Sequence, residues 1–149
     1  MSPLRNRIAL LHGVNLGMLG RRDAAHYGTI TLGELERTVT AFAHELGLEL
    51  SCFQTNSEAE FVERIHHLPV HADGVVINPG AWTHYSWAIH DALEIAGLPA
   101  VEVHLSKVDD REPWRQLSVV RDLVLACVSG QGVEGYREAL VRLSKALEG

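Results

Sequence analysis

Glu102 and His104 are the first pair of residues in this sequence whose types and spacing could do chemistry. They lie two positions apart in the largely apolar run 99–104. Alternate residues of a strand point to the same face, so a strand here would place the carboxylate beside the imidazole. A neighbouring carboxylate fixes the tautomer of an imidazole and favours its protonated form, which makes a serviceable general acid. The same spacing also suits a hydrogen-bonded pair at a strand end that has no catalytic role.

Arg22 and Tyr27 form a second pair, in the long glycine-containing loop 12–28. A tyrosine acts as a base only where its phenolate is favoured, because the ordinary pKa of a phenol is about 10. A nearby guanidinium favours that phenolate, so Tyr27 is a candidate base. By position alone, a packing role for Tyr27 and a surface role for Arg22 remain the simpler interpretation. The glycines of the loop match neither G-x-G-x-x-G nor a Walker loop, so phosphate binding is a weak alternative.

Polar side chains gather most densely in the stretch 78–91. It follows the β-favouring residues 74–77, and after an Asn-Pro-Gly break the apolar residues regain helical spacing. We therefore expect a strand, a tight turn and a helix, with the turn at the sheet edge where α/β folds bind ligands. Further along, Arg111 and Arg115 could bind an oxygen-rich substrate or could pair with acidic neighbours at 109, 110 and 112.

The elements that must position these groups alternate regularly along the chain. Helices are indicated by capping-box signatures beginning at Thr31 and Ser57 and by apolar stripes at helical spacing. The pattern predicts one domain over 1–149, with an α/β, flavodoxin-like, doubly wound sheet of five parallel strands in the order 2-1-3-4-5. In that order the loops after strands one, three and four can build one pocket. The strands are expected at residues 7–11, 48–53, 74–77, 99–104 and 123–128.

Composition narrows the class of protein. The net charge is −6 over 149 residues with no compensating basic stripe, which argues against a nucleic-acid partner. The apolar runs are far shorter than the ~20 residues that span a bilayer, and the N-terminus lacks the apolar region of a signal peptide. A cytoplasmic protein with no membrane partner is expected. Cys52 and Cys127 lie in apolar runs without metal-ligand spacing, so they are interpreted as buried thiols and no metal site is predicted.

Taken together, these segments resemble type II 3-dehydroquinate dehydratases over nearly the whole chain. Each segment alone is a weak signal, but the combination is highly specific. The segments that carry the resemblance include Asn15-Leu-Gly-Met-Leu-Gly20, Gln54-Thr-Asn-Ser-Glu58, Ile77-Asn-Pro-Gly-Ala-Trp-Thr-His84, Glu102-Val-His104-Leu-Ser106 and Arg111-Glu-Pro-Trp-Arg115.

The resemblance implies an anti elimination of water from 3-dehydroquinate through an enolate, giving 3-dehydroshikimate without a metal or cofactor. Tyr27 would be the base, with Arg22 on a closing loop favouring its phenolate. Asn15 would hold a water that stabilises the enolate. His104, oriented by Glu102, would protonate the departing hydroxyl.

The resemblance also implies how a small-molecule substrate is bound and how the chain assembles. Side chains would bind the substrate hydroxyls, and the backbone after the fourth strand would bind its carboxylate. One further residue would reach a neighbour's site, because the family builds trimers that assemble into dodecamers. The side chains that would bind hydroxyls are Asn78, His84 and Arg115. The backbone that would bind the carboxylate is that of Leu105 and Ser106, and the residue that would reach a neighbour's site is Asp91.

Four departures from the family pattern leave the exact substrate open. His12, Val14, His90 and Lys107 replace residues that flank the substrate or support its neighbours. They suggest a less efficient enzyme, improved by asparagine at positions 12 and 107, or one that acts on a related hydroxylated cyclohexanone acid. A different class of function is a flavodoxin-like module that binds a nucleotide or flavin, which would purify as a yellow protein.

Overall fold

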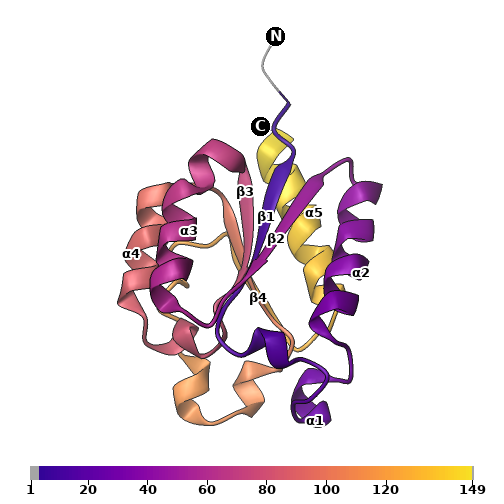
Figure 1. Ribbon diagram of the computed structural model, residues 1–149, viewed down its shortest axis with the longest axis vertical. Helices are drawn as coiled ribbons and strands as arrows, with labels where there is room; N and C mark the ends of the chain where they lie inside the picture. The colour runs from indigo at the N-terminus through magenta and orange to yellow at the C-terminus, as the bar shows by residue number, and fades with distance from the viewer. Residues whose placement is uncertain (1–3, 149) are drawn as a thin grey trace.

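The computed structural model describes residues 4–148, and its centre is a five-stranded parallel sheet in the order β2-β1-β3-β4-β5 (Figure 1). This confirms the predicted flavodoxin-like α/β fold and its strand order. Strands β1, β3 and β4 are buried along nearly their whole length, as expected for a sheet covered on both faces. The strands are β1 Arg7–His12, β2 Glu49–Gln54, β3 Gly74–Asn78, β4 Ala100–His104 and β5 Ala126–Ser129.

The fifth strand is the one whose start was wrongly predicted. It begins at Ala126 rather than at 123, whereas the other strand boundaries differ from the prediction by a single residue. Leu123 and Val124 pack against the core from a turn, and Leu123 closes that turn by donating its amide to the Val120 carbonyl. Their apolar character reflects this packing and not strand pairing.

Two helices cover each face of the sheet (Figure 1). On one face, α2 (Leu32–Glu45) and α5 (Glu134–Glu148) bury a core that includes Leu10, Val76 and Tyr136. On the other, α3 (Glu58–His71) and α4 (Trp87–Ala96) bury Leu11 and Ile77. Neighbouring residues of one strand thus enter different cores, because side chains of a strand alternate between its faces.

Of the two predicted capping boxes, only the first is complete. Thr31 accepts from the Glu34 amide, and the Glu34 carboxylate accepts from the Thr31 amide in return. Ser57 caps α3 by accepting from the Glu60 amide, but the Glu60 side chain accepts instead from the Thr55 hydroxyl at 3.0 Å. The second box is therefore replaced by a contact with the loop that follows β2.

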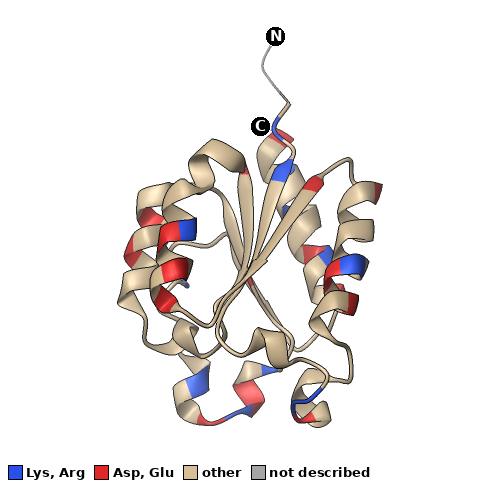
Figure 2. Cartoon of the chain, viewed as in Figure 1, with Lys and Arg blue, Asp and Glu red and all other residues tan. Residues whose placement is uncertain are grey.

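Short helical segments gather beyond the carboxyl ends of the strands (Figure 1). Acidic and basic residues lie together in these connections and are interspersed on the outer helices (Figure 2). The segments are η1 (Leu16–Met18), α1 (Ala24–Tyr27), η2 (Gly80–His84), η3 (Val108–Asp110) and η4 (Pro113–Gln116).

A close backbone approach joins the loops after β1 and β3. The amide of Gly13 donates to the Asn78 carbonyl at 2.7 Å. A Cβ atom at position 13 would lie 2.1 Å from the carbonyl oxygen of Pro79, so only glycine permits this approach.

No helix within residues 4–148 is long and apolar enough to cross a membrane.

Candidate active site

One cavity lies at the carboxyl edge of the sheet, between the loops that follow β1, β3 and β4. Nine of the eleven predicted site residues line it, which supports the expectation that these three loops build one pocket. Glu102 lies behind His104, and Asp91 lies outside the cavity. The nine are Asn15, Arg22, Tyr27, Asn78, His84, His104, Leu105, Ser106 and Arg115.

Tyr27 is placed by the short helix α1, whose start is capped by the carboxylate of Asp23. Two guanidinium groups donate to its phenolic oxygen, Arg22 Nη2 at 2.9 Å and Arg111 Nη1 at 3.1 Å. The phenolic oxygen of Tyr27 therefore faces two positively charged donors. The predicted pairing of Arg22 with Tyr27 is confirmed.

Arg111 is a functional residue whose contact was missed. From the sequence it was a candidate for binding substrate or pairing with an acidic neighbour. It does approach Glu112, at 3.8 Å, but its Nη1 atom serves Tyr27. The two residues are separated by 84 positions, so no local pattern could have paired them.

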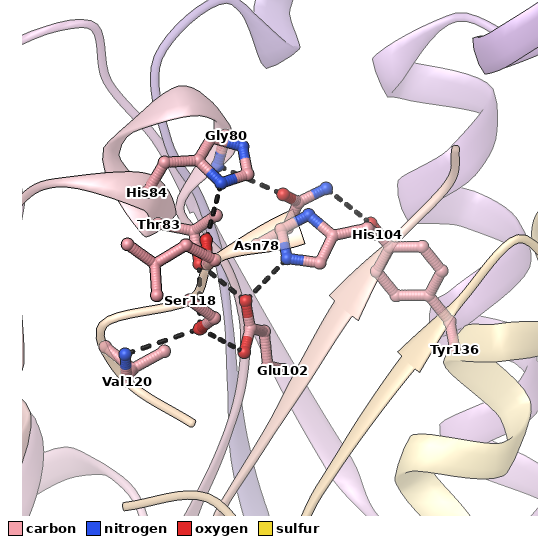
Figure 3. A network of polar contacts seen from close by, with 10 residues as sticks. Asn78, Gly80, Thr83, His84, Glu102, His104, Ser118, Val120 and Tyr136 are labelled. Carbon is pink, nitrogen blue, oxygen red and sulfur yellow. Dashed lines mark hydrogen bonds and ion pairs between the residues drawn. The ribbon is translucent and has the colours of Figure 1, made fainter. Parts of the chain in front are cut away.

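Glu102 and His104 form the predicted pair on one face of β4, with His104 Nε2 donating to Glu102 Oε2 at 2.6 Å. Glu102 has no exposed surface. Two further donors complete its shell (Figure 3): Thr83 Oγ1 bonds Oε2 at 2.5 Å and Ser118 Oγ bonds Oε1 at 2.8 Å. Burial alone would raise the pKa of Glu102, but the bonds from His104, Thr83 and Ser118 outweigh it and lower the pKa to about 2. The carboxylate is therefore charged.

Asn78 and His84 are held in fixed orientations at the cavity wall (Figure 3). The side-chain Nδ2 of Asn78 donates to the Tyr136 hydroxyl at 3.4 Å, and its Oδ1 accepts from the backbone amide of Gly80 at 3.1 Å. His84 Nδ1 donates to the Leu117 carbonyl at 2.7 Å, which leaves Nε2 as its second polar atom. Burial, the largest cause, lowers the pKa of His84, so the ring is suited to neutral hydrogen bonding with a hydroxyl.

Arg115 and Asn15 reach the cavity from less protected positions. Arg115 lines the cavity while its Nε donates to Glu112 at 2.5 Å, so the sequence alternatives of substrate binding and a salt bridge coexist. Asn15 has a left-handed backbone with φ of 70°, a conformation that asparagine tolerates better than most residues. Its amide donates to the Asn56 side chain, which holds this turn against the loop after β2.

Asp91 does not enter the cavity of its own chain. Its side chain is 71% exposed on α4 and accepts from His90 Nδ1 at 3.0 Å. This hydrogen bond is the largest cause of the raised pKa of His90, whose other nitrogen meets Asp122. That Asp91 completes a neighbour's site stays a prediction.

The four departures from the family pattern are scattered. Among these described residues, only Val14 lines the cavity. His12 is wholly buried and bonds Glu36 beneath α2. Lys107 is exposed and its Nζ lies 3.8 Å from Asp110. Of the four departures, only Val14 is therefore placed to alter contacts with the substrate directly.

Two groups of potential metal donors occur in the described chain, His12 with Glu36 and Cys52, and Glu102 with His104 and Cys127. A thiol must lose its proton to bind a metal. Burial, reinforced by the nearby carboxylate, raises the pKa of both thiols to about 12. Each carboxylate already accepts a hydrogen bond from the histidine of its group. The donors thus suit hydrogen-bonded clusters better than metal sites.

The fold and the site define a class of protein, a flavodoxin-like α/β enzyme with a candidate base and a candidate acid facing one cavity at the switch point of the sheet. Comparison with known proteins gives the family. Residues 6–144 match the family described as dehydroquinase class II, and the chain belongs to this family.

Similar proteins agree with that family over almost their full lengths. A relative from Pelobacter propionicus named 3-dehydroquinate dehydratase is 49% identical, with 95% of each chain covered. A relative from Pseudomonas putida named 3-dehydroquinate dehydratase 2 is 47% identical, covering 99% of this chain and 97% of its own. The crystal structure of the type II dehydroquinase from Propionibacterium acnes superposes with a TM-score of 0.90 at 41% identity, covering 97% and 99% of the two chains.

Proposed function

We propose that this protein dehydrates 3-dehydroquinate to 3-dehydroshikimate by an anti elimination through an enolate. One observation carries the proposal: a phenol that accepts from two guanidinium groups shares a cavity with a histidine bound to a buried, charged carboxylate. The names of the similar proteins supply the substrate.

In the first step the phenolate of Tyr27 takes the proton from C2 of the substrate. Arg22 and Arg111 stabilise the negative oxygen before transfer, since hydrogen bonds to the charged form favour that form. The electron pair of the broken C–H bond moves into the enolate. Asn15, at the cavity wall, holds a water that donates to the enolate oxygen.

In the second step the enolate collapses and expels the hydroxyl from the face of the ring opposite to the one that lost its proton. His104 delivers a proton to that hydroxyl, which leaves as water. The carboxylate of Glu102 stabilises the imidazolium before the transfer, and afterwards the pair carries one negative charge until a solvent proton returns to His104. Tyr27 holds the abstracted proton, so atoms and charge balance, and proton exchange with solvent resets both groups.

Binding residues surround the two proton-transfer groups. His84, with Nδ1 occupied by the Leu117 carbonyl, offers Nε2 as an acceptor for a substrate hydroxyl. Asn78 and Arg115 bind further hydroxyls, and the backbone at 105–106 binds the carboxylate. Asp91 reaches a neighbour's cavity in a trimer-based, dodecameric assembly. Because most departures from the family pattern lie outside the cavity, the geometry favours 3-dehydroquinate over a related cyclohexanone acid.

A direct assay tests the proposal. Purified protein and 3-dehydroquinate are expected to produce the ultraviolet absorbance of a conjugated enone. The matched Tyr27→Phe variant keeps the ring and loses the base, so its turnover should fall at least about a thousandfold with binding retained. Failure of the wild type to form the enone would refute the function, and a variant with more than a tenth of wild-type activity would refute Tyr27 as the base.

A further inference from the structure

The carboxylate of Glu102 is held by more than the catalytic histidine. Thr83, from η2 after β3, and Ser118, from the segment after η4, each direct a hydroxyl at it from a different connection (Figure 3). A buried carboxylate without a cation requires several donors to stay ionised. Two of the three donors therefore come from residues to which the proposed mechanism assigns no part.

We propose that Thr83 and Ser118 are positioning residues for the dehydration, which keep Glu102 oriented and ionised so that the transferable proton resides on His104. The inference rests on the proposed function and adds two residues to it. Neither residue lines the cavity, so both act through Glu102.

The hydroxyls are oriented before any substrate binds. The Val120 amide donates to Ser118 Oγ at 3.3 Å, so the proton of this hydroxyl is left free to point at Glu102 Oε1. The Val119 amide donates to the Thr83 carbonyl at 2.8 Å, and the two hydroxyl oxygens lie 3.3 Å apart. Backbone bonds thus fix both donors against each other, and reaction requires no reorganisation of them.

Loss of these donors changes where the proton resides. Glu102 would then depend on His104 alone, and a poorly solvated carboxylate takes the proton from the imidazolium. His104 would become neutral and could no longer protonate the departing hydroxyl. The pair as a whole would also hold its proton to higher pH, because the ionised carboxylate is the form that the hydroxyls stabilise.

Other groups that face the pair do not reproduce this behaviour. His84 approaches from η2, and burial lowers its pKa. Cys127 approaches from β5 with a pKa raised to about 12, mainly by burial. Arg115 from η4 carries a permanent charge that acts on His84. A shift in the alkaline limb of the kcat–pH profile when a hydroxyl is removed can therefore be distinguished from the titration of these groups.

The test uses Thr83→Val and Ser118→Ala in the full chain. Each should lower kcat about 10- to 100-fold, because a hydrogen bond to a charged group is lost. KM should stay within about twofold, and the alkaline limb of the kcat profile should move up by about one pH unit. Thr83→Ser, which retains the hydroxyl, should restore both values. A merely structural role would lower thermal stability or raise KM without moving the profile, and that result would overturn the proposal.

Two further measurements keep the proposal falsifiable. In a Glu102→Gln background, Ser118→Ala should change kcat less than about twofold, since no carboxylate remains to be kept ionised. Full additivity would contradict the proposal. Nitrogen-15 spectra of His104 in the free protein should show a larger neutral fraction of the ring in Ser118→Ala than in wild type at the same pH. That measurement needs no substrate, so it tests the role of the two hydroxyl groups independently of whether the protein dehydrates 3-dehydroquinate.

Discussion

Two histidines in this protein meet a carboxylate at the end of a buried strand, and only one is placed for chemistry. His104 ends β4 and bonds Glu102 at 2.6 Å, and His12 ends β1 and bonds Glu36 at 3.1 Å. A half-buried cysteine lies beside each pair. From the sequence only His104 was a candidate acid, because its carboxylate lies two positions away, whereas the carboxylate partner of His12 lies 24 positions along the chain.

The difference lies in the carboxylate and in what the second ring nitrogen faces. Glu102 is fully buried and kept charged by three donors, whereas the Glu36 side chain on α2 is 29% exposed. His104 lines the cavity, but His12 Nδ1 is buried with no hydrogen-bond partner among the described residues. Burial lowers the pKa of His12 to about 4 despite Glu36, so this ring is neutral. A histidine–carboxylate contact therefore becomes an acid only where the carboxylate is fixed and the ring faces the cavity.

The largest expected effect separates the two histidines. His104→Asn should lower kcat by about 10²–10⁴, the usual cost of removing a general acid, with little change in KM. The matched His12→Asn should leave kcat within about threefold, because the His12 side chain is turned toward α2. Steady-state kinetics on both variants checks this. Equal losses in the two variants would show that His104 and His12 do not differ in their role in catalysis.

Substitution of the two carboxylates, Glu102 and Glu36, should show the same contrast in kcat as substitution of the histidines, but a smaller one. Glu102→Gln removes the charge that supports the imidazolium and should cost about 10- to 100-fold in kcat. Glu36→Gln keeps an acceptor for His12 and should leave kcat within about twofold. Measurement of kcat at the pH optimum of each variant tests the contrast, which fails if Glu36→Gln is the more damaging change.

The two histidine–carboxylate pairs should affect the free energy of unfolding in different pH ranges. The folded pKa of His12 is lowered from 6.5 to about 4, so the unfolded chain binds the extra proton and stability is lost as pH falls through that window. The folded pKa of Glu102 is lowered from 4.5 to about 2, so its contribution is present above 4.5 and is lost as pH falls toward 2. Each window is worth roughly 3 kcal/mol.

Denaturant unfolding at a series of pH values measures these windows. His12→Asn should flatten the curve between pH 6.5 and 4 and leave the lower window intact. Glu102→Gln should flatten only the lower window. A curve that His12→Asn does not alter would show that this buried ring does not govern the upper window.

The smallest expected effect concerns two residues that differ from the family pattern. His12 is turned away from the cavity and Lys107 is exposed beside Asp110. Asparagine at both positions should therefore change kcat/KM less than about threefold, in place of the improvement that the family pattern suggested. A tenfold gain would show that these positions influence the site through their neighbours.

The sequence predicted what depends on local spacing. The strand order, the Glu102–His104 contact and the Arg22–Tyr27 contact all follow from residues a few positions apart or from the alternation of elements. Arg111 on Tyr27 and Ser118 on Glu102 depend instead on how one long connection folds back over the sheet edge. The start of β5 was misplaced for a related reason, because tertiary packing and strand pairing both favour apolar residues.

The connection between β4 and β5 is fastened partway along its length, where the Val119 amide binds the Thr83 carbonyl. In terms of chain mobility, this bond divides residues 105–125 into two shorter loops. The entropy gained is small, since halving a loop changes its closure free energy by only about 0.6 kcal/mol. The effect on reach is larger. Arg111 lies in a loop that is anchored at both ends, so it can withdraw from Tyr27 only by a local deformation of that loop and not by a swing of the whole connection.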